Sequence, residues 1–317
     1  MTLRIGSLCS GYGGLDLAVE AVFDARTAWF CEHDRDPSAI LAHHWPHVPN
    51  HGDVKTTDWS QVEPVDILTA GYPCPPFSIA GKRKGADDPR HLWPDVATAI
   101  SVLRPRLAVL ENVAGHLTLG FADVLGDLAT LGYDARWGVV RASDAGAPHR
   151  RERIFVVASD TRSRSLPRPP AADDRLPVAA ERRHGADADP DRHGHGTGQD
   201  AGGVGPVDGE DAGGARERER ARQVARDRGA APVEWGAYDA AIARWAAVLG
   251  RPAPGPVDDG RLNPRFAEWL MGLPEGHVTD VPGLSAPAQL KAIGNGVVPQ
   301  QAALALRLLL ADMAAAA

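Results

Sequence analysis

Cys74 lies between two prolines, which would hold its thiol in a nearly fixed position. Cys74 lies in the stretch 71–78, GYPCPPFS, directly after the apolar run 65–70, which predicts a buried strand. A free thiol has a pKa of about 8.5 and is only slightly ionised at neutral pH. A helix N-terminus or nearby arginines would raise its thiolate fraction, which makes Cys74 a candidate nucleophile. The alternative interpretation is a small, buried, apolar cysteine.

Two acidic residues end other predicted strands. Glu32 follows the run 26–31, and Glu111 opens the tripeptide ENV at the end of the run 107–111. An acid at such a strand end can bind ribose hydroxyls. A carboxyl group held protonated in a dry site can donate to a base ring nitrogen. Ordinary surface or helix-capping acids are the alternatives for both positions.

A glycine-rich turn, SGYGG at 10–14, separates the first predicted strand from a helix. This arrangement lets a ligand approach the backbone and exposes free N–H groups at the helix N-terminus. The spacing is not G-x-G-x-x-G, which disfavours a nicotinamide dehydrogenase. The alternative is an ordinary turn.

Two basic segments complete the candidate chemistry. The stretch 79–92, IAGKRKGADDPRHL, could be a lid that closes on phosphates, or a solvated loop. The stretch 148–153, PHRRER, carries Arg151 and Arg153, which would lie on the same side of an extended segment because they are two residues apart. Arginines there can orient a carboxylate or a pyrimidine carbonyl.

Strands that alternate with helices must position these residues. Apolar runs predict strands at 3–9, 26–31, 65–70, 107–111 and 153–158. Helical patterns follow at 15–23, 38–45, 95–103 and 121–131. The alternation predicts an α/β fold with a doubly wound, mainly parallel, Rossmann-like sheet. Glu32, Cys74 and Glu111 then fall at the strand ends where such sheets bind ligands.

The composition changes near residue 160. Residues 160–232 are dense in Arg, Asp, Gly, Pro and Ala, and we predict that they are largely disordered. A helical pattern at 233–249 and the ordered stretch 262–279 predict a small second domain. A closing helix at 299–313 returns to the sheet. We divide the chain into 1–159 (sheet domain), 160–232 (insert), 233–287 (small domain) and 288–317 (return to the sheet domain).

Bulk properties limit the class of protein. The 317 residues are 44% hydrophobic, which is enough for a real core, and no uninterrupted apolar run reaches 18 residues. Three cysteines without CxxC spacing fit a reducing compartment and disfavour a metal site built on cysteine. The net charge of −7 disfavours a general nucleic-acid coat protein but not a local basic cleft. We expect a cytoplasmic protein without a membrane span.

Taken in order, the motifs resemble the DNA cytosine-5 methyltransferases of bacterial or phage restriction–modification type. SLCSGYGGLD is similar to the family's cofactor loop, FCEHD to its second motif, and GDV at 52–54 to its adenine-contacting segment. GYPCPPFSIAGKRKG resembles the catalytic Pro-Cys loop, and ENV the glutamate motif. PHRRER resembles Q-x-R-x-R, and KAIGNGVVP the late G-N-S-V-x-x-P motif. The resemblance covers residues 3–158 and about 288–313, roughly the whole sheet domain.

The resemblance implies methyl transfer from S-adenosylmethionine to C5 of a flipped-out cytosine in double-stranded DNA. Cys74 is the implied nucleophile at C6, Glu111 stabilises N3 protonation, and Arg151 and Arg153 orient the base. The implied cofactor residues are Gly11, Gly13, Gly14, Glu32, His33, Asp53 and Asn295. The implied phosphate-contacting residues of the lid are Lys82, Arg83 and Lys84, and no metal is implied. A target recognition domain within 233–287, a monomer and a cognate restriction endonuclease as genetic partner complete the expectation.

Three positions depart from the family pattern. Pro75 stands where glutamine is common, His149 replaces the glutamine of Q-x-R-x-R, and Gly296 replaces the serine after Gly-Asn. The first two leave the nucleophile intact and concern the hydrogen bonds around it.

Other functions stay open at this point. An amino methyltransferase acting on adenine N6 or cytosine N4 uses an acid, asparagine or serine before Pro-Pro-aromatic, whereas Cys74 precedes Pro75-Pro76-Phe77 here. An RNA cytosine-5 methyltransferase would share the fold. A non-catalytic DNA- or cofactor-binding regulator is disfavoured by the presence of both the Pro-Cys and ENV motifs.

Overall fold

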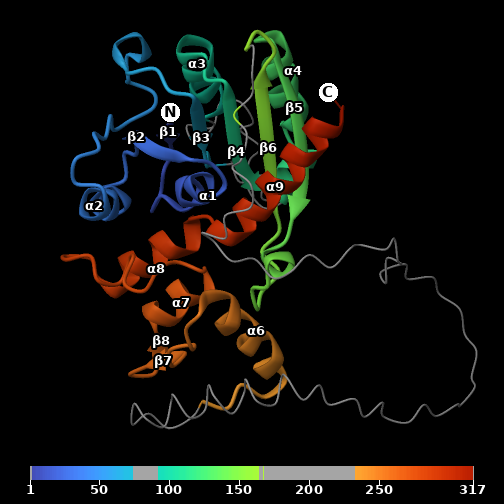
Figure 1. Ribbon diagram of the computed structural model, residues 1–317. Coiled ribbons are helices and arrows are strands. Elements are labelled where there is room, and N and C mark those ends of the chain that lie inside the picture. The colour runs from blue at the N-terminus through green and yellow to red at the C-terminus, as the bar shows by residue number, and fades with distance from the viewer. Residues whose placement is uncertain (1, 74–91, 164–166, 168–232, 317) are drawn as a thin grey trace, which may run out of the picture.

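A computed structural model describes residues 2–73, 92–163, 167 and 233–316. The predicted nucleophile Cys74, the lid residues Lys82, Arg83 and Lys84, and most of the insert 160–232 lie outside the described residues. The described elements form a sheet domain with a small unit below it (Figure 1).

The sheet domain is built on one six-stranded sheet. Its strand order is β2-β1-β3-β4-β6-β5. β1 to β4 are mutually parallel, whereas β6 is antiparallel to both β4 and β5. The α/β, mainly parallel prediction is therefore confirmed, with an antiparallel pair at one edge. The strands are β1 (Leu3–Leu8), β2 (Ala25–Cys31), β3 (Ile67–Ala70), β4 (Leu107–Val113), β5 (Tyr133–Val140) and β6 (Arg153–Asp160).

Helices cover both faces of the sheet, so most strand residues outside the edge strand β5 are buried. α3 (Trp93–Leu103) and α4 (Phe121–Thr130) pack on one face, and α1 (Gly14–Val22) and α9 (Pro299–Ala316) on the other (Figure 1). α2 (Arg35–His44) lies beyond β2 and contacts α8 (Ala286–Asn295). The two faces have separate apolar cores, so the last helix of the chain completes the core that α1 begins.

The small unit, residues 233–295, has its own apolar cluster centred on Trp245 and Trp269, both fully buried. Trp235, Phe266 and Trp269 stack in series, with ring centroids 5.3 and 6.1 Å apart. Tyr12 and Ile40 of the sheet domain join this cluster. The domain boundaries drawn from the sequence stay predictions. The elements of the small unit are α6 (Asp239–Leu249), the hairpin of β7 (Val257–Asp258) and β8 (Arg261–Leu262), α7 (Pro264–Leu270) and α8.

Several local expectations were wrong. The sequence pattern missed β5 and the β7–β8 hairpin, and the helix predicted from residue 233 begins only at Asp239. Within the ordered stretch 262–279, only Pro264–Leu270 is α-helical.

By length and composition, the stretch Ala286–Ala315 could span a membrane, but 61% of its most apolar window is buried in the protein. It combines α8 and α9, and α9 is a core helix of the sheet domain.

A buried carboxyl group lies at the start of α1. Asp16 is fully buried, with Oδ2 2.8 Å from the Ser7 hydroxyl and Oδ1 2.6 Å from the Thr69 hydroxyl. The Thr69 hydroxyl is also 3.4 Å from the Gly6 carbonyl oxygen. The Ser7 and Thr69 hydroxyls therefore both donate to the Asp16 carboxyl group. Burial raises the pKa of Asp16 to about 7, despite the two hydroxyl contacts that lower it.

Asp16 should make the protein less stable as pH rises from about 4 to about 7. In that window the unfolded chain has lost the Asp16 proton while the folded chain still holds it, so folding takes up a proton. Asp16→Asn reproduces the donor and acceptor pattern of the protonated acid. We expect it to become more stable relative to wild type, by a few kcal/mol at most, between these pH values. Urea unfolding at both pH values measures the difference, and a pH-independent difference would contradict the assignment.

Candidate functional site

A cavity of about 600 Å³ opens at the carboxyl ends of the parallel strands. This is the edge at which doubly wound sheets bind ligands. The cavity lies between the sheet and α8, and seven of the site residues predicted from the sequence line it. They are Gly11, Glu32, His33, Asp53, Glu111, Arg153 and Asn295.

Two backbone hydrogen bonds orient the Glu32 carboxylate on one side of the cavity. Its Oε2 accepts a hydrogen bond from the Gly11 N–H at 2.9 Å, and its Oε1 accepts one from the Asp34 N–H at 2.8 Å. Burial raises the pKa of Glu32, while these two backbone donors lower it. The contacts fix the carboxylate against the glycine turn and leave further lone pairs for hydroxyl donors.

The other residues assigned to a cofactor divide into two groups. His33, Asp53 and Asn295 line the cavity, and Asn295 is the last residue of α8. Gly13 and Gly14 do not line it. Gly13 has a φ of 82° and caps α1, and Gly14 begins that helix against the backbone of Val297, so their contacts are structural.

Glu111 lies on the opposite side of the cavity, where the parallel pairing of β3 and β4 ends. The last paired residues are Ala70 and Leu110, so Gly71 and Glu111 begin the divergence of the two chains. A Cβ atom on Gly71 would be 3.7 Å from Glu111 Oε2, which places this carboxyl beside the backbone that enters GYPC. Burial raises the pKa of Glu111 to about 7, and the nearby guanidinium groups only partly offset the effect.

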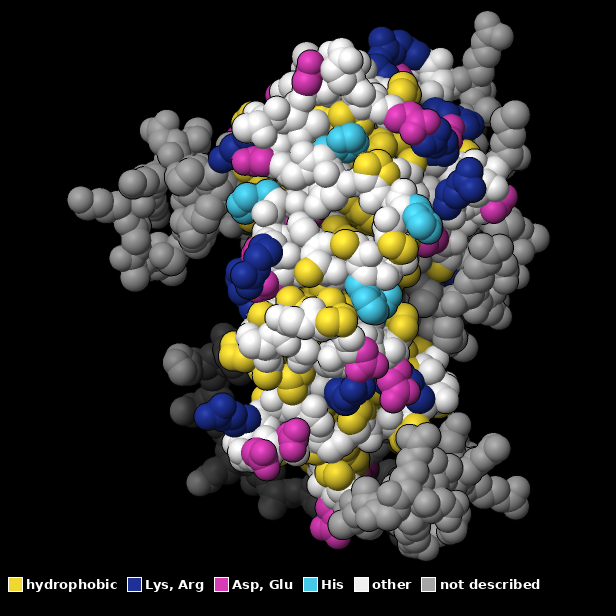
Figure 2. Space-filling model, turned by 90° about the vertical axis from the view of Figure 1, so that its left-hand side faces the viewer, with side chains coloured by type: hydrophobic (Ala, Val, Ile, Leu, Met, Phe, Trp, Pro, Cys, Tyr) yellow, Lys and Arg dark blue, Asp and Glu magenta, His cyan; other side chains and the backbone are white. Residues whose placement is uncertain are grey.

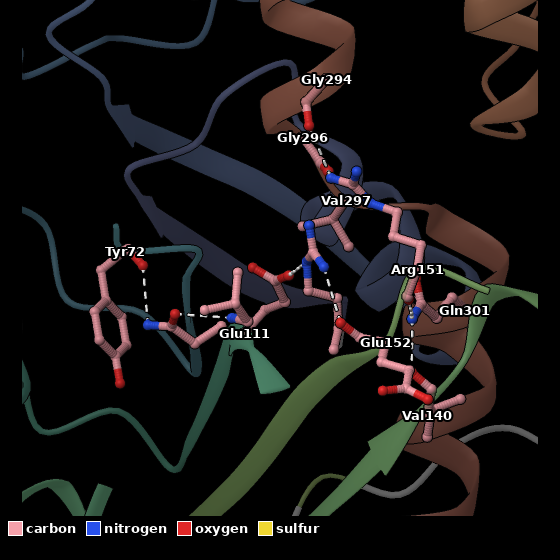
Figure 3. Close-up of polar contacts among 12 residues, drawn as sticks. Tyr72, Glu111, Val140, Arg151, Glu152, Gly294, Gly296, Val297 and Gln301 are labelled. Carbon is pink, nitrogen blue, oxygen red and sulfur yellow. Dashed lines mark hydrogen bonds and ion pairs between the residues drawn. The ribbon is translucent and has the colours of Figure 1, made fainter. Parts of the chain in front are cut away.

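Arg151 and Arg153, the two arginines of PHRRER assigned to the site, have different partners. Arg153 Nε lies 3.0 Å from Glu111 Oε1, whereas Arg151 donates to the carbonyl oxygens of Gly294 and Gly296 at 3.0 and 2.6 Å. Figure 3 shows Arg151 reaching the end of α8 while Glu111 stays at the sheet. The expectation of an extended segment was wrong at Arg151, whose φ is 35°, because β6 begins only at Arg153. Arg151 therefore holds the turn after α8 and does not line the cavity.

Sequence reasoning missed residues whose partners are remote in the chain. Asn112 donates from Nδ2 to the Tyr72 carbonyl oxygen at 3.1 Å and so fixes the backbone two residues before Cys74. Its place in ENV was a usable signal. Lys291 lines the cavity and pairs with Asp34 at 2.8 Å. No local pattern links two residues that are 257 positions apart.

The structure accounts for two departures from the family pattern. A Cβ atom on Gly296 would overlap the ring of Tyr12, whose hydroxyl donates to the Val297 carbonyl oxygen at 2.7 Å. A tyrosine in the glycine turn thus excludes serine at 296. His149 donates from Nε2 to the Leu270 carbonyl oxygen at 2.9 Å, which ties PHRRER to the end of α7.

The charged residues on the face formed by α2, α8 and the small unit are dispersed. Figure 2 shows basic side chains that mostly stand singly beside acidic ones, with exposed histidines between them. Within the part of the chain that the structure describes, this face therefore offers no continuous basic surface for DNA. The basic stretch 82–84 lies outside the described residues.

Comparison with known proteins gives one family. Residues 3–183 match the family described as C-5 cytosine-specific DNA methylase. The Type II methyltransferase M.NaeI of Lentzea aerocolonigenes is 40% identical over 168 residues, which are 50% of this chain and 40% of that protein. A protein of Escherichia phage P1 named DNA N-6-adenine-methyltransferase is 42% identical over 130 residues, which are 37% of this chain and 17% of that protein. The matches thus span less than half the length of these relatives.

Solved structures share the fold. The S. pombe Dnmt2 methyltransferase aligns with a TM-score of 0.60 at 16% identity, over 98% of this chain and 99% of that one. The Entamoeba histolytica methyltransferase EhMeth aligns with a TM-score of 0.60 at 15% identity, over 99% of both chains. At these identities the likeness supports the arrangement of the elements alone.

Proposed function

Because the chain belongs to the C-5 cytosine-specific DNA methylase family, we propose that it transfers a methyl group from S-adenosylmethionine to C5 of cytosine in a specific sequence of double-stranded DNA. One observation carries the proposal: residues suited to a nucleoside cofactor and residues suited to a pyrimidine line the same cavity. Its volume of about 600 Å³ fits a small-molecule site. Glu32 lies on the first side and Glu111 on the second.

The donor set on the cofactor side fits S-adenosylmethionine. Glu32 is oriented by two backbone N–H groups and can accept from ribose hydroxyls. His33 would pack against the adenine, Asp53 would contact its edge, and Asn295 would close the cavity from α8. When bound, S-adenosylmethionine supplies an electrophilic methyl group on its sulfonium sulfur.

The base side would activate C5 through addition at C6. The Cys74 thiolate bonds to C6 as Glu111 delivers a proton to N3, which turns the ring into an enamine that is nucleophilic at C5. After methylation, loss of the C5 proton, expulsion of the Cys74 thiolate and return of the N3 proton to the Glu111 carboxylate would restore the ring. Arg153 would hold the Glu111 carboxyl in place. Arg151 donates to the carbonyl oxygens on either side of Asn295, so it would hold the cofactor side rather than orient the base.

The target cytosine must leave the duplex to reach this cavity, at a cost of a few kcal/mol. Phosphate contacts from Lys82, Arg83 and Lys84 would offset that cost. The small domain predicted within 233–287 would read the target sequence. A paired restriction endonuclease stays the expected genetic partner, and the relatives named Type II methyltransferase suit that expectation.

The proposal predicts a modified cytosine in a single short motif. We expect expression in a methylation-free bacterial host to protect cytosines of that motif from bisulfite conversion. Cys74→Ala should protect none, because without the thiolate C5 is too weak a nucleophile. The same variant should bind S-adenosylmethionine with nearly unchanged affinity, since Cys74 is assigned to the base and not to the cofactor.

Reading the same DNA for N6-methyladenine separates the alternatives. Methylated adenine without protected cytosine would replace the proposal by the activity for which the phage P1 relative is named. Cytosine protection that survives Cys74→Ala would reject Cys74 as the nucleophile. Joint loss of cofactor binding and activity in Cys74→Ala would also contradict the assignment.

A further inference from the structure

A histidine of the small unit holds the glycine turn that borders the cavity. His277 is buried, and its Nε2 lies 2.8 Å from the carbonyl oxygen of Tyr12. A carbonyl oxygen can only accept, so His277 donates. Tyr12 follows Gly11, which lines the cavity and donates its N–H to Glu32. The His277 bond therefore acts on the backbone one residue from the proposed cofactor contact.

The loop that carries His277 is fixed from behind by a buried acid. Glu268 of α7 is 1% exposed, and it accepts hydrogen bonds from three backbone N–H groups that flank His277. The donors are Gly276 and Val278, each at 2.7 Å, and Thr279 at 2.9 Å. A carboxylate with several backbone donors is strongly held. The backbone on both sides of His277 is thus held to α7 by hydrogen bonds.

A second histidine fixes the imidazole from the α2 side. His44 Nε2 donates to the His277 carbonyl oxygen at 2.7 Å, and the two rings stack with centroids 4.2 Å apart and planes 6° apart. Burial, together with the neighbouring His44 and His43, lowers the pKa of His277 to about 4, although the hydrogen bond to Tyr12 opposes the shift. The neutral ring then has one N–H, and the contact with Tyr12 places that proton on Nε2.

We propose that His277 is a positioning residue that couples the small unit to S-adenosylmethionine binding by holding the Tyr12 carbonyl. The inference rests on the proposed function in that the cavity must bind S-adenosylmethionine. It adds a route by which the unit expected to read DNA sets the shape of the cofactor turn. Displacement of the loop 276–279 would release Tyr12, and with it the Gly11 N–H that orients Glu32.

The proposal is tested by isothermal titration of the full chain with S-adenosylmethionine. His277→Ala removes the donor and should raise the Kd about tenfold, which equals about 1.4 kcal/mol, the upper part of the range for a net hydrogen bond. His277→Gln keeps an N–H near the position of Nε2 and should stay within about threefold of wild type. His47→Ala, an exposed histidine after α2, serves as the matched control and should leave the Kd unchanged.

The outcomes separate the inference from the function on which it rests. A wild-type chain that does not bind S-adenosylmethionine would reject the proposed cofactor and, with it, the coupling. Wild-type binding together with an unchanged Kd in folded His277→Ala would overturn the coupling alone. A glutamine variant no better than the alanine variant would also overturn it, because a purely structural loss would not be rescued by the donor. Thermal melting of each variant establishes that it is folded at the titration temperature.

Discussion

Replacing Glu111 by glutamine is expected to lower the rate constant for methyl transfer by a factor of about 10²–10⁴. The carboxyl is buried beside Gly71, and burial raises its pKa to about 7, so a large share of it is protonated at neutral pH. Glutamine preserves the shape and an N–H donor but cannot deliver a proton to N3. Single-turnover kinetics with cofactor in excess measure the effect on the chemical step.

The pH profile distinguishes proton delivery from a loss of shape. The protonated form of Glu111 predominates below pH about 7, so the wild-type rate should fall as pH rises above that value. The residual rate of Glu111→Gln should not decrease in this way as pH rises. The thiolate requirement of Cys74 acts in the opposite direction, because ionisation of a thiol increases with pH.

Glu20→Gln is the matched control for this experiment. Glu20 is a half-buried acid whose pKa is also raised by burial, but it bonds Thr27 and does not line the cavity. We expect its rate and pH profile to match wild type. An unchanged rate constant in Glu111→Gln would show that Glu111 takes no part in the reaction. If the rate of this variant still fell as pH rises above about 7, the fall would belong to another group.

The second large effect concerns stability. Gly296→Ser should lower the free energy of unfolding by about 1–3 kcal/mol or more, because its Cβ would overlap the Tyr12 ring. Tyr12 is fully buried, and its hydroxyl bonds the Val297 carbonyl oxygen, so the ring has little freedom to move. Thermal denaturation should show a midpoint several degrees below that of wild type.

Two variants test the steric cause. Gly294→Ser lies two residues earlier, where an added Cβ meets nothing within 4 Å, and should be close to neutral. Tyr12→Ala is destabilising by itself, but it empties the space that a serine at 296 would need. We expect the loss of unfolding free energy in the double variant Tyr12→Ala, Gly296→Ser to be at least about 1 kcal/mol smaller than the sum of the losses in the two single variants. Strict additivity would reject the overlap.

The sequence predicted the parallel part of the sheet because each of those strands is an apolar run bounded by turns. It missed β5, since the alternating exposure of YDARWGVV at a sheet edge combines apolar residues with Asp, Arg and Gly. The antiparallel direction of β6 could not be read either. Strand direction depends on which neighbours the strand joins, and composition does not encode that choice.

The candidate site divides in the same way. Glu32 and Glu111 were predictable, because strand ends at one edge of a parallel sheet converge. The separate partners of Arg151 and Arg153 were not, because one residue with a φ of 35° breaks the extended geometry that spacing alone assumes. The contact of His277 with Tyr12 joins residues 265 positions apart and needs the tertiary structure.

The position of α9 has a consequence for how the chain is made. α9 contains the last described residues, yet it packs on α1, β5 and β6 and supplies much of the apolar core on that face. A nascent chain emerging from the ribosome therefore carries an uncovered sheet face until residues 299–316 have been released. An uncovered apolar face makes a partly folded chain prone to aggregation. The core on this face is therefore completed only when α9 has been made, after every other described element of the sheet domain.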